Sequence, residues 1–260
     1  MSGDLVKLNI RDHTGTIILN RPDKRNALSR ALIGDMAQAF SDLHQERRVR
    51  AVVVTGAGTA FCAGMDLSEM RETAGSDASA ERFAEDAVSY QNLLTQMLEF
   101  PKPIIAAVNG AAVAGGAGLV LASDIVVAAA EAAIGLPEPR RGIVAGLVTP
   151  ILAFRIGAGA AARLLLTGSL IDAATAREIG LFHEVVAADH LWPRAAELAV
   201  ECAQCAPEAL QLTKRMLNET VGENLRTLLS TGAAVSATAR TTEAAKEGLA
   251  AFLEKRDPVW

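Results

Sequence analysis

The fold of this chain is decided by residues 103–136, which read PIIAAVNGAAVAGGAGLVLASDIVVAAAEAAIGL. The pattern predicts a buried strand over residues 104–108, a glycine turn, an apolar helix that begins near Gly115, and a second strand over residues 125–129. Glycine at the start of a helix leaves bare backbone N–H groups, which can stabilise developing negative charge. The stretch therefore predicts a strand–loop–helix–strand unit with an anion-stabilising loop.

An earlier stretch, residues 50–70, follows the same plan and reads RAVVVTGAGTAFCAGMDLSEM. Residues 50–55 are typical of a buried strand, residues 56–64 form a glycine-rich loop, and Asp66 is a candidate N-cap for a helix that begins near Leu67. Two strands of one sheet would thus each deliver a glycine loop to the same edge. Two backbone donors aimed at one point make an oxyanion hole.

Strands and helices alternate along the rest of the first 190 residues. Strands are expected at residues 5–10, 16–19 and 182–186, the first two as a hairpin, and helices at residues 30–46, 82–100, 149–156, 158–167 and 171–179. The polar segment at residues 69–81 is expected to be a mobile loop. This alternation predicts an α/β fold with largely buried parallel strands.

The C-terminal part of the chain shows no strand pattern. Helices are expected at residues 192–206, 207–219, 224–239 and 242–255. We therefore expect two units, a core of residues 1–190 and a helical subdomain of residues 191–260.

Composition excludes several classes of protein. The net charge of −5 and the pI near 5.5 provide no basic patch, so neither nucleic acid nor a membrane surface is an expected partner. The 103–136 stretch is long and apolar, yet Asn109, Asp124 and Glu131 interrupt it, so it is not expected to span a membrane. Three cysteines make no disulfide framework, and no basic segment followed by an apolar one opens the chain. A reducing cytoplasm is the expected compartment.

Three other motifs are incomplete. The GAG that follows the first long strand lacks the third glycine of a dinucleotide-binding loop. Cys202 and Cys205 have no second pair and no neighbouring histidine, so no metal site is expected. There is no G-x-S-x-G nucleophile motif.

Glu138 is the acid that the sequence singles out. It lies between Pro137 and Pro139 in the segment GLPEPRRGI, with apolar neighbours and two glycine loops upstream. Most acids at turns are simply solvated. The constrained, apolar setting instead favours a general acid/base.

Five segments in fixed order resemble one family over nearly the whole chain. They are NRPDKRNALS, FCAGMDLSEM, PKPIIAAVNGAAVAGGAGLVLASDIVVAA, GLPEPRRGI and ARLLLTGSLIDAATAREIGLFHEVV. Together they resemble the enoyl-CoA hydratase/isomerase (crotonase) superfamily. The runs GGAGLVLASD and GLVTPILAFRIG look similar to its methylglutaconyl-CoA hydratase-like branch, which acts on branched unsaturated thioesters.

The resemblance implies a spiral of ββα units built from two nearly perpendicular sheets, with C-terminal helices that make trimers and commonly hexamers. It implies an acyl-CoA thioester substrate and no cofactor other than the coenzyme A of that substrate. It places the oxyanion hole at the backbone N–H groups of Met65 and Gly115. Residues implied to contact coenzyme A are Lys24, Arg25, Ala27, Ala63, Asp66, Leu67, Phe252 and Lys255, the last two reaching the coenzyme of a neighbouring subunit.

The chain departs from the family pattern at Gly118. Typical hydratases of the family carry a glutamate there and a second one at the position of Glu138. With one acid left, three readings stay open: a hydratase in which Glu138 does both proton transfers, an isomerase that moves a double bond with Glu138 alone, and a catalytically weak acyl-CoA-binding protein. The branch similarity favours hydration.

Overall fold

Two sheets organise the structure, a computed structural model that describes residues 5–222 and 224–260; the first four residues of the predicted 1–190 unit lie outside it. The larger sheet has the order β1-β2-β3-β5-β7-β10 and the smaller one β4-β6-β8-β9. The larger sheet consists of β1 (Val6–Arg11), β2 (Thr14–Leu19), β3 (Ala51–Gly56), β5 (Ile104–Val108), β7 (Ile125–Ala129) and β10 (Glu184–Val186). The smaller sheet consists of β4 (Ala60–Cys62), β6 (Ala111–Val113), β8 (Ala133–Gly135) and β9 (Leu170–Asp172).

The larger sheet is parallel except for the β1–β2 hairpin. Both faces of β3 and β5 are buried, because successive apolar side chains point to opposite sides and meet helices on each. The predicted α/β fold with buried parallel strands is therefore confirmed.

The helices cover the sheets in the order expected from the sequence. Their bounds are α1 Arg30–Gln45, α2 Leu67–Ala74, α3 Ser79–Glu99, α4 Gly115–Ala122, α5 Val148–Thr167, α6 Ala173–Glu178, α7 Ala188–Ala203, α8 Pro207–Arg215, α9 Leu225–Ala239 and α10 Glu243–Glu254. Two 3-10 turns, η1 (Pro22–Lys24) and η2 (Glu138–Arg141), and a π-helical turn, η3 (Met216–Val221), complete the list.

The chain repeats one unit, a strand in the larger sheet, a strand in the smaller sheet and a helix. The units are β3-β4-α2, β5-β6-α4 and β7-β8-α5. Within the smaller sheet Cys62 pairs with Ala112, and Ala112 with Ile134, all in parallel strands. The loops that follow β4 and β6 therefore emerge side by side.

Two expectations need correction. Residues 69–81 are not a mobile loop: α2 covers the segment up to Ala74, and α3 already begins at Ser79. The helix buries only Met70 and Thr73, so its polar exposed face resembles a loop in sequence. The three-residue strands of the smaller sheet were also not predicted, because such short runs show no alternation.

The helix α5 bends at Gly157, whose φ of 76° and ψ of 155° are not helical. The two helices expected at residues 149–156 and 158–167 thus meet at this glycine. Among the described residues α5 is the one helix long and apolar enough to cross a membrane, but it packs on α4 and α9. The 103–136 stretch is divided among short strands and α4, and so contains no such helix.

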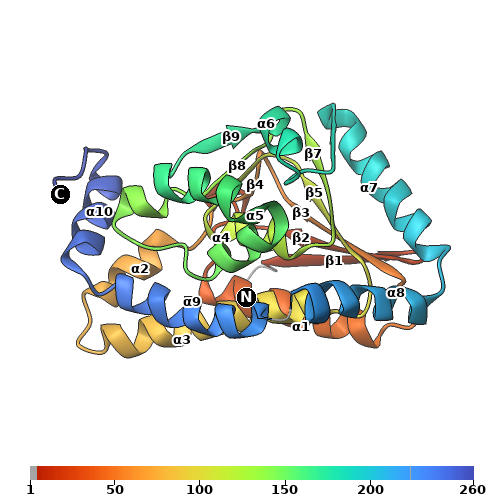
Figure 1. Cartoon of the computed structure of the whole chain (residues 1–260), viewed down its shortest axis with the longest axis horizontal. Helices are drawn as coiled ribbons and strands as arrows, with labels where there is room; N and C mark the ends of the chain where they lie inside the picture. Colours follow the sequence, from red (N-terminus) through yellow and green to blue (C-terminus); the bar gives the residue numbers. More distant parts are fainter. Residues whose placement is uncertain (1–4, 223) are drawn as a thin grey trace.

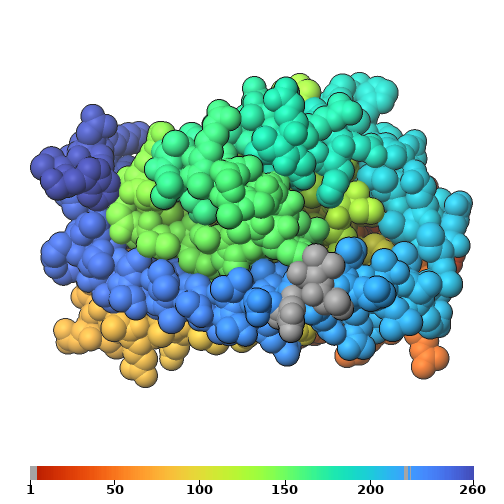
Figure 2. Space-filling model, viewed as in Figure 1, coloured from red at the N-terminus to blue at the C-terminus, as the bar shows by residue number. Residues whose placement is uncertain are grey.

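The C-terminal helices pack on the rest of the chain in different places. Helix α7 covers one face of the larger sheet through Leu191, Ala195, Leu198 and Ala199 (Figure 1). Helix α9 runs along α3 and also touches α5, and Figure 2 shows it as a blue band directly below the green surface of α5. This arrangement encloses the space between α3, α5 and η2, where the candidate site lies.

Candidate active site

The first predicted oxyanion donor, Met65, lies in the loop between β4 and α2. Leu28 and Met65 form a parallel bridge, in which the Leu28 N–H donates to Gly64 O (2.8 Å) and the Asp66 N–H donates to Leu28 O (3.0 Å). The N–H of Met65 lies between these two bonds and has no acceptor in the described part of the chain. It is therefore available to a ligand.

The second predicted donor, Gly115, is the first residue of α4, where a backbone N–H has no intrahelical acceptor. Ala114 before it has φ 54° and ψ −122°, a conformation that a residue with a side chain rarely adopts. Such backbone strain collects at functional sites because the surrounding fold must maintain it. Here it turns the chain from β6 into α4 and sets the orientation of the Gly115 peptide.

The two donor loops lie against each other. A Cβ built on Gly64, whose φ is 88°, would come within 3.2 Å of the Gly115 nitrogen, and a Cβ on Gly115 within 3.5 Å of the Met65 methyl group. The parallel pairing of β4 with β6 produces this proximity. The structure thus brings together two unpaired N–H groups that the sequence separates by fifty residues.

Glu138 opens η2 and is 6% exposed. Its Oε2 atom has no hydrogen-bond partner among the described residues. Burial raises the pKa of Glu138 to about 7, and the positive charges of Arg141 and Arg240 offset only part of this effect. A buried carboxyl that titrates near neutral pH can both accept and return a proton.

Met65, Gly115 and Glu138 line one cavity of about 470 Å³, counting its open mouth. Its other walls come from α2, α3, the segment between η2 and α5, and α9. The lining residues from these elements include Leu67, Met70, Tyr90, Ile143, Val148, Ser236 and Arg240. A largely apolar pocket with few polar groups is the usual form of a small-molecule site.

Tyr90 fills the space beside Gly118. A Cβ added to Gly118 would overlap the Tyr90 hydroxyl and approach Val148 Cγ2 to 3.2 Å. That hydroxyl donates a hydrogen bond to the carbonyl of Gly115. Burial, with smaller effects from Cys62 and Glu138, raises the pKa of Tyr90 well above its ordinary value, so the phenol stays neutral. The position of the absent first glutamate is therefore occupied by a neutral aromatic donor.

Most residues predicted to contact coenzyme A form a second cluster, held together by Arg21. The Arg21 guanidinium donates to Ala27 O (2.5 Å) and to Asp66 Oδ2 (2.9 Å). Burial alone would raise the pKa of Asp66, but the bonds from Arg21 and from the Ser68 N–H outweigh it and lower the pKa. Arg21 thus joins the two loops.

The other members of this cluster lie on the same two loops. The Ala63 N–H donates to Arg25 O (3.0 Å), Lys24 and Arg25 are exposed, and Leu67 begins α2. The role of Arg21 could not be predicted from the sequence, because only the folded structure shows that its side chain reaches the second loop.

Phe252 and Lys255 lie apart from this cluster, at the end of α10. The Arg141 guanidinium lies 4.2 Å from the centre of the Phe252 ring. Lys255 is exposed and caps the helix. Phe252 therefore contacts Arg141, a residue of the cavity wall in its own chain, while the predicted contact with a neighbouring subunit's coenzyme stays a prediction.

Two cavity residues were missed by sequence reasoning, Arg141 and Arg240. Arg141 lies in the quoted motif three residues after Glu138, and Arg240 follows the C-terminal end of α9, a hundred residues away with no motif around it. In the part of the chain that the structure describes, no group of three or more histidine, cysteine or acidic side chains could hold a metal ion.

Comparisons with known proteins point to one family. A family model described as enoyl-CoA hydratase/isomerase matches residues 10–260. A Thermus thermophilus protein named "Putative enoyl-CoA hydratase" is 41% identical over 95% of this chain and 97% of its own length. A bovine protein named enoyl-CoA hydratase domain-containing protein 2, mitochondrial, is 34% identical over 93% of this chain and 82% of its own length. The crystal structure of an enoyl-CoA hydratase from Mycobacterium avium superposes with a TM-score of 0.88, at 32% identity and 98% coverage of both chains.

Proposed function

Because the chain belongs to the enoyl-CoA hydratase/isomerase family, we propose that it is a hydratase that adds water across the double bond of a 2-enoyl-CoA thioester. The observation that carries the proposal is Glu138, a buried acid with a pKa of about 7 that shares a cavity with two unpaired N–H groups. No second acid is proposed.

The proposed reaction uses Glu138 twice. Its carboxylate accepts a proton from water as the water oxygen attacks C3 of the substrate, and the electrons of the double bond move onto the thioester oxygen. The protonated Glu138 then donates that proton to C2, which completes the addition of water. A pKa near the working pH makes the two transfers similarly easy.

The N–H groups of Met65 and Gly115 are proposed to bind the thioester oxygen while it carries the negative charge. The helix that starts at Gly115 adds the positive end of its dipole. Each such donor typically contributes about 10²–10³ in rate. Since only backbone is used, a side chain at position 65 is tolerated.

Coenzyme A is proposed to lie along the two loops that Arg21 joins. The loop from Lys24 to Ala27, with Lys24 and Arg25 as exposed cations, is proposed to meet its phosphates, and Ala63, Asp66 and Leu67 are proposed to surround its adenine end. Phe252 and Lys255 are proposed to meet the coenzyme of a neighbouring subunit. No further cofactor is proposed.

An isomerase is the second candidate. In that reaction Glu138 removes a proton from C2 of a 3-enoyl-CoA and returns it to C4, which shifts the double bond without adding water. The observation in its favour is that Tyr90 and Val148 occupy the space beside Gly118, the position of the absent first glutamate.

Product mass separates these reactions. Wild type and Glu138→Gln are incubated with 2-enoyl-, 3-enoyl- and branched unsaturated acyl-CoAs, and products are analysed by mass spectrometry. Hydration predicts a product that is heavier by one water. The Glu138→Gln variant is expected to form this product about 10²–10⁴ times more slowly. A shifted double bond at unchanged mass would establish the isomerase instead. If neither product forms while coenzyme A thioesters still bind, the chain is an acyl-CoA-binding protein.

The matched control is Met65→Ala. The proposed donor is the backbone N–H, so this variant is expected to keep its turnover within a few-fold of wild type. A hundredfold loss of turnover would show that the oxyanion hole does not use the backbone N–H of Met65.

Assembly and compartment are proposed from the family. A trimer or a dimer of trimers fits the large apolar side chains that stay exposed on the C-terminal helices, among them Trp192, Val200, Leu212, Met216 and Leu228. The family relatives include a bacterial protein and one named mitochondrial, and a cytoplasmic location is proposed for this chain.

A further inference from the structure

The first turn of α4 carries a proposed oxyanion donor on a nearly bare backbone. Its sequence at residues 115–118 is GGAG, and no side chain caps its N-terminus. Glycine lacks the Cβ that restricts φ and ψ, so it leaves the backbone freer than alanine would. The large side chains that anchor α4 in the core come later in the helix, at residues 119–121. The turn that directs the Gly115 N–H is therefore the part of α4 with the fewest side chains to hold it.

Close packing explains why this turn is so bare. A Cβ on Gly116 would overlap the backbone of Cys62 at the end of β4, and a Cβ on Gly118 would overlap the Tyr90 hydroxyl. The neighbours of the turn thus leave no room for the side chains that would stiffen it. Any further restraint on this backbone has to come from hydrogen bonds.

Three hydrogen bonds restrain the peptides around the donor. The Ala114 N–H donates to Gly135 O (2.9 Å), and the Gly118 N–H donates to Ala114 O (3.2 Å). These two bonds hold the entry side of the peptide whose N–H belongs to Gly115. On the exit side, the Tyr90 hydroxyl donates to Gly115 O. Among the described residues, Tyr90 is the one side chain that forms a hydrogen bond with the backbone of this turn.

Tyr90 is a firm anchor for this bond. It lies in the middle of α3, is 1% exposed and belongs to the main apolar core, so its neighbours fix the position of its ring. Burial is the main cause that raises the pKa of Tyr90 well above its ordinary value, so the hydroxyl keeps the proton that it donates. Helix α3 has 21 residues against eight in α4, and it packs on α1 and α9 as well as on α4. The longer helix can therefore hold the shorter one in place.

We propose that Tyr90 is a positioning residue of the oxyanion hole: its hydroxyl fixes the Gly115 carbonyl, and through it the direction of the Gly115 N–H. The inference rests on the proposed function insofar as it takes this N–H as a donor to the thioester oxygen. An oxyanion hole is effective because its donors are already oriented when the charge develops. Hydrogen bonds weaken steeply as they depart from linear geometry, so a loosely held Gly115 peptide would lose part of that effect. The tyrosine that excludes a glutamate at position 118 thus supports the donor three residues earlier.

The test is Tyr90→Phe, which removes the hydroxyl and keeps the ring. The direct readout is the thioester carbonyl of bound acetyl-CoA, the smallest acyl thioester, which cannot be hydrated and is labelled with ¹³C at that carbon. The carbonyl stretching frequency, measured by infrared difference spectroscopy, falls as the oxygen receives stronger hydrogen bonds. Wild type is expected to lower this frequency relative to free acetyl-CoA, and Tyr90→Phe is expected to lose a large part of that shift.

Turnover provides the second readout. With the unsaturated thioester that wild type converts, Tyr90→Phe is expected to lower kcat about tenfold, less than the roughly 10²–10³ that follows the loss of a whole donor. Because the restraint matters most when the oxygen carries its charge, KM should stay within a few-fold of wild type.

Two control variants separate positioning from other roles. Leu93→Val trims a buried side chain one turn further along α3 that does not line the cavity. It is expected to lower the melting temperature, as Tyr90→Phe does, and yet to keep the wild-type carbonyl frequency and kcat. Glu138→Gln is expected to slow turnover but to keep the carbonyl frequency, because its side chain is not part of the oxyanion hole.

Three outcomes would overturn the inference. A wild-type carbonyl frequency in Tyr90→Phe would do so and leave the proposed hydratase standing. An equally large loss of the shift in Leu93→Val would reduce Tyr90 to ordinary core packing. A wild type that does not shift the carbonyl at all would overturn both the inference and the proposed oxyanion hole. In contrast, a shift that depends on Tyr90 in a protein that forms no product would reject the proposed reaction and support the inference.

Discussion

Gly118 and Tyr90 compete for one space in the candidate site. The Tyr90 hydroxyl reaches the Gly115 carbonyl only because position 118 has no side chain. A glutamate at 118 would have to displace the ring, which is 1% exposed and packed in the core. The two-acid arrangement is thus excluded sterically in this chain, and the loss of one acid and the presence of the tyrosine form a single structural change.

We predict that Gly118→Ala lowers the free energy of unfolding by about 1–3 kcal/mol, the usual cost of overpacking a core. Combining it with Tyr90→Phe removes the overlapping hydroxyl, so the double variant should lose less than the sum of the two single losses. Urea denaturation of the four proteins measures this coupling. Gly34→Ala on α1, with open space around the added methyl group, is the control and should raise stability by about 0.5–1 kcal/mol. Additive losses would contradict the shared space.

The pH dependence of catalysis should follow Glu138. Since the proposed hydration begins with the ionised carboxylate, kcat/KM is expected to fall about tenfold per pH unit below a pKa of about 7 and to level off above it. Measuring kcat/KM for a stable 2-enoyl-CoA from pH 5 to pH 9 defines this acidic limb of the pH profile. Removing a nearby positive charge raises a carboxyl pKa, so Arg240→Gln should move the limb to higher pH, whereas Arg140→Gln should not. A profile flat from pH 5 to pH 9 would reject Glu138 as the base.

Sequence alone gives some of these residues and not others. Glu138 could be predicted because two prolines and apolar neighbours mark its position locally. The family resemblance then places donors at Met65 and Gly115, where the structure shows unpaired N–H groups. Arg240 could not be found in this way, because its significance arises from burial beside residues a hundred positions away in the chain.

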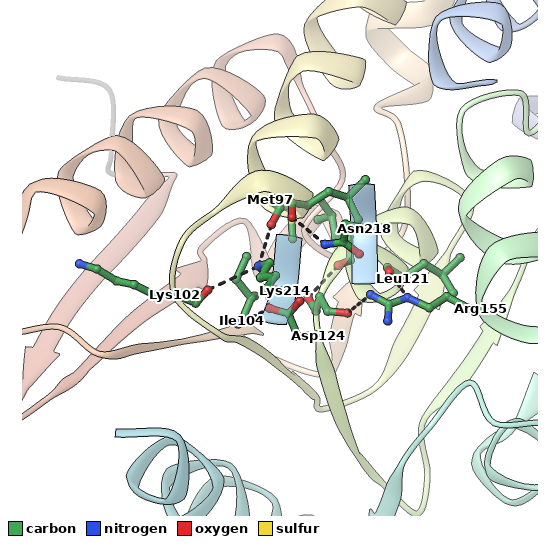
Figure 3. Close-up of polar contacts among 11 residues, drawn as sticks. Met97, Lys102, Ile104, Leu121, Asp124, Arg155, Lys214 and Asn218 are labelled. Atoms are coloured by element: carbon green, nitrogen blue, oxygen red, sulfur yellow. Dashed lines mark hydrogen bonds and ion pairs between the residues drawn. The ribbon is translucent and has the colours of Figure 1, made fainter. Parts of the chain in front are cut away.

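Helix α8 is attached to the core through one buried lysine. Lys214 Nζ donates to Asp124 Oδ2 (2.7 Å), Met97 O (3.1 Å) and Lys102 O (3.4 Å), and the side chain is 9% exposed (Figure 3). Asp124 also accepts from the Ile104 N–H at 2.8 Å. One ion pair therefore connects α8, the end of α3 and the start of β5.

Neighbouring bonds extend this connection. Asn218 donates to Leu98 O (2.8 Å), and Arg155 of α5 donates to Leu121 O (3.0 Å) and Ser123 O (2.7 Å) at the end of α4 (Figure 3). The polar groups at these helix ends are thus satisfied by side chains.

We predict that Lys214→Met destabilises the protein by about 3 kcal/mol, because it leaves Asp124 and two carbonyl groups without their buried partner. Lys246→Met removes an exposed i,i+3 pair with Glu243 and should change stability by less than about 0.5 kcal/mol. Chemical denaturation compares the two. Equal, small effects would show that α8 is held by apolar packing instead.

Elements of ordinary length were predicted well, and short ones were not. Helices α1, α3 and α9 and strands β3, β5 and β7 carry a full apolar period, which the sequence displays directly. The strands of the smaller sheet have three residues each, and β4, β6 and β8 each follow a longer strand of the larger sheet, which positions them for pairing. The smaller sheet is therefore a consequence of tertiary structure that local patterns do not encode.

At the scale of the whole molecule, the exposed apolar side chains predict self-association. Leu166 is 82% exposed on α5, and the C-terminal helices expose several more large side chains. Multi-angle light scattering is expected to give a mass of three or six times 27.2 kDa. Charged substitutions at Leu166 and Leu212 should reduce that mass if the apolar faces form the contact. A monomer at micromolar concentration would contradict the prediction.

The repeating unit that passes from the larger sheet to the smaller one has an evolutionary consequence. In the proposed site the two charge-stabilising groups are peptide N–H groups, which every residue except proline supplies, and their positions follow from strand pairing. Substitution of Met65 by most other residues would consequently leave the reaction largely unchanged. The acid/base chemistry, in contrast, depends on one side chain, that of Glu138. Proteins that share this fold can therefore evolve new reactions by changing the acid and the residues that line the pocket. The two backbone N–H groups that stabilise the transition state are retained throughout.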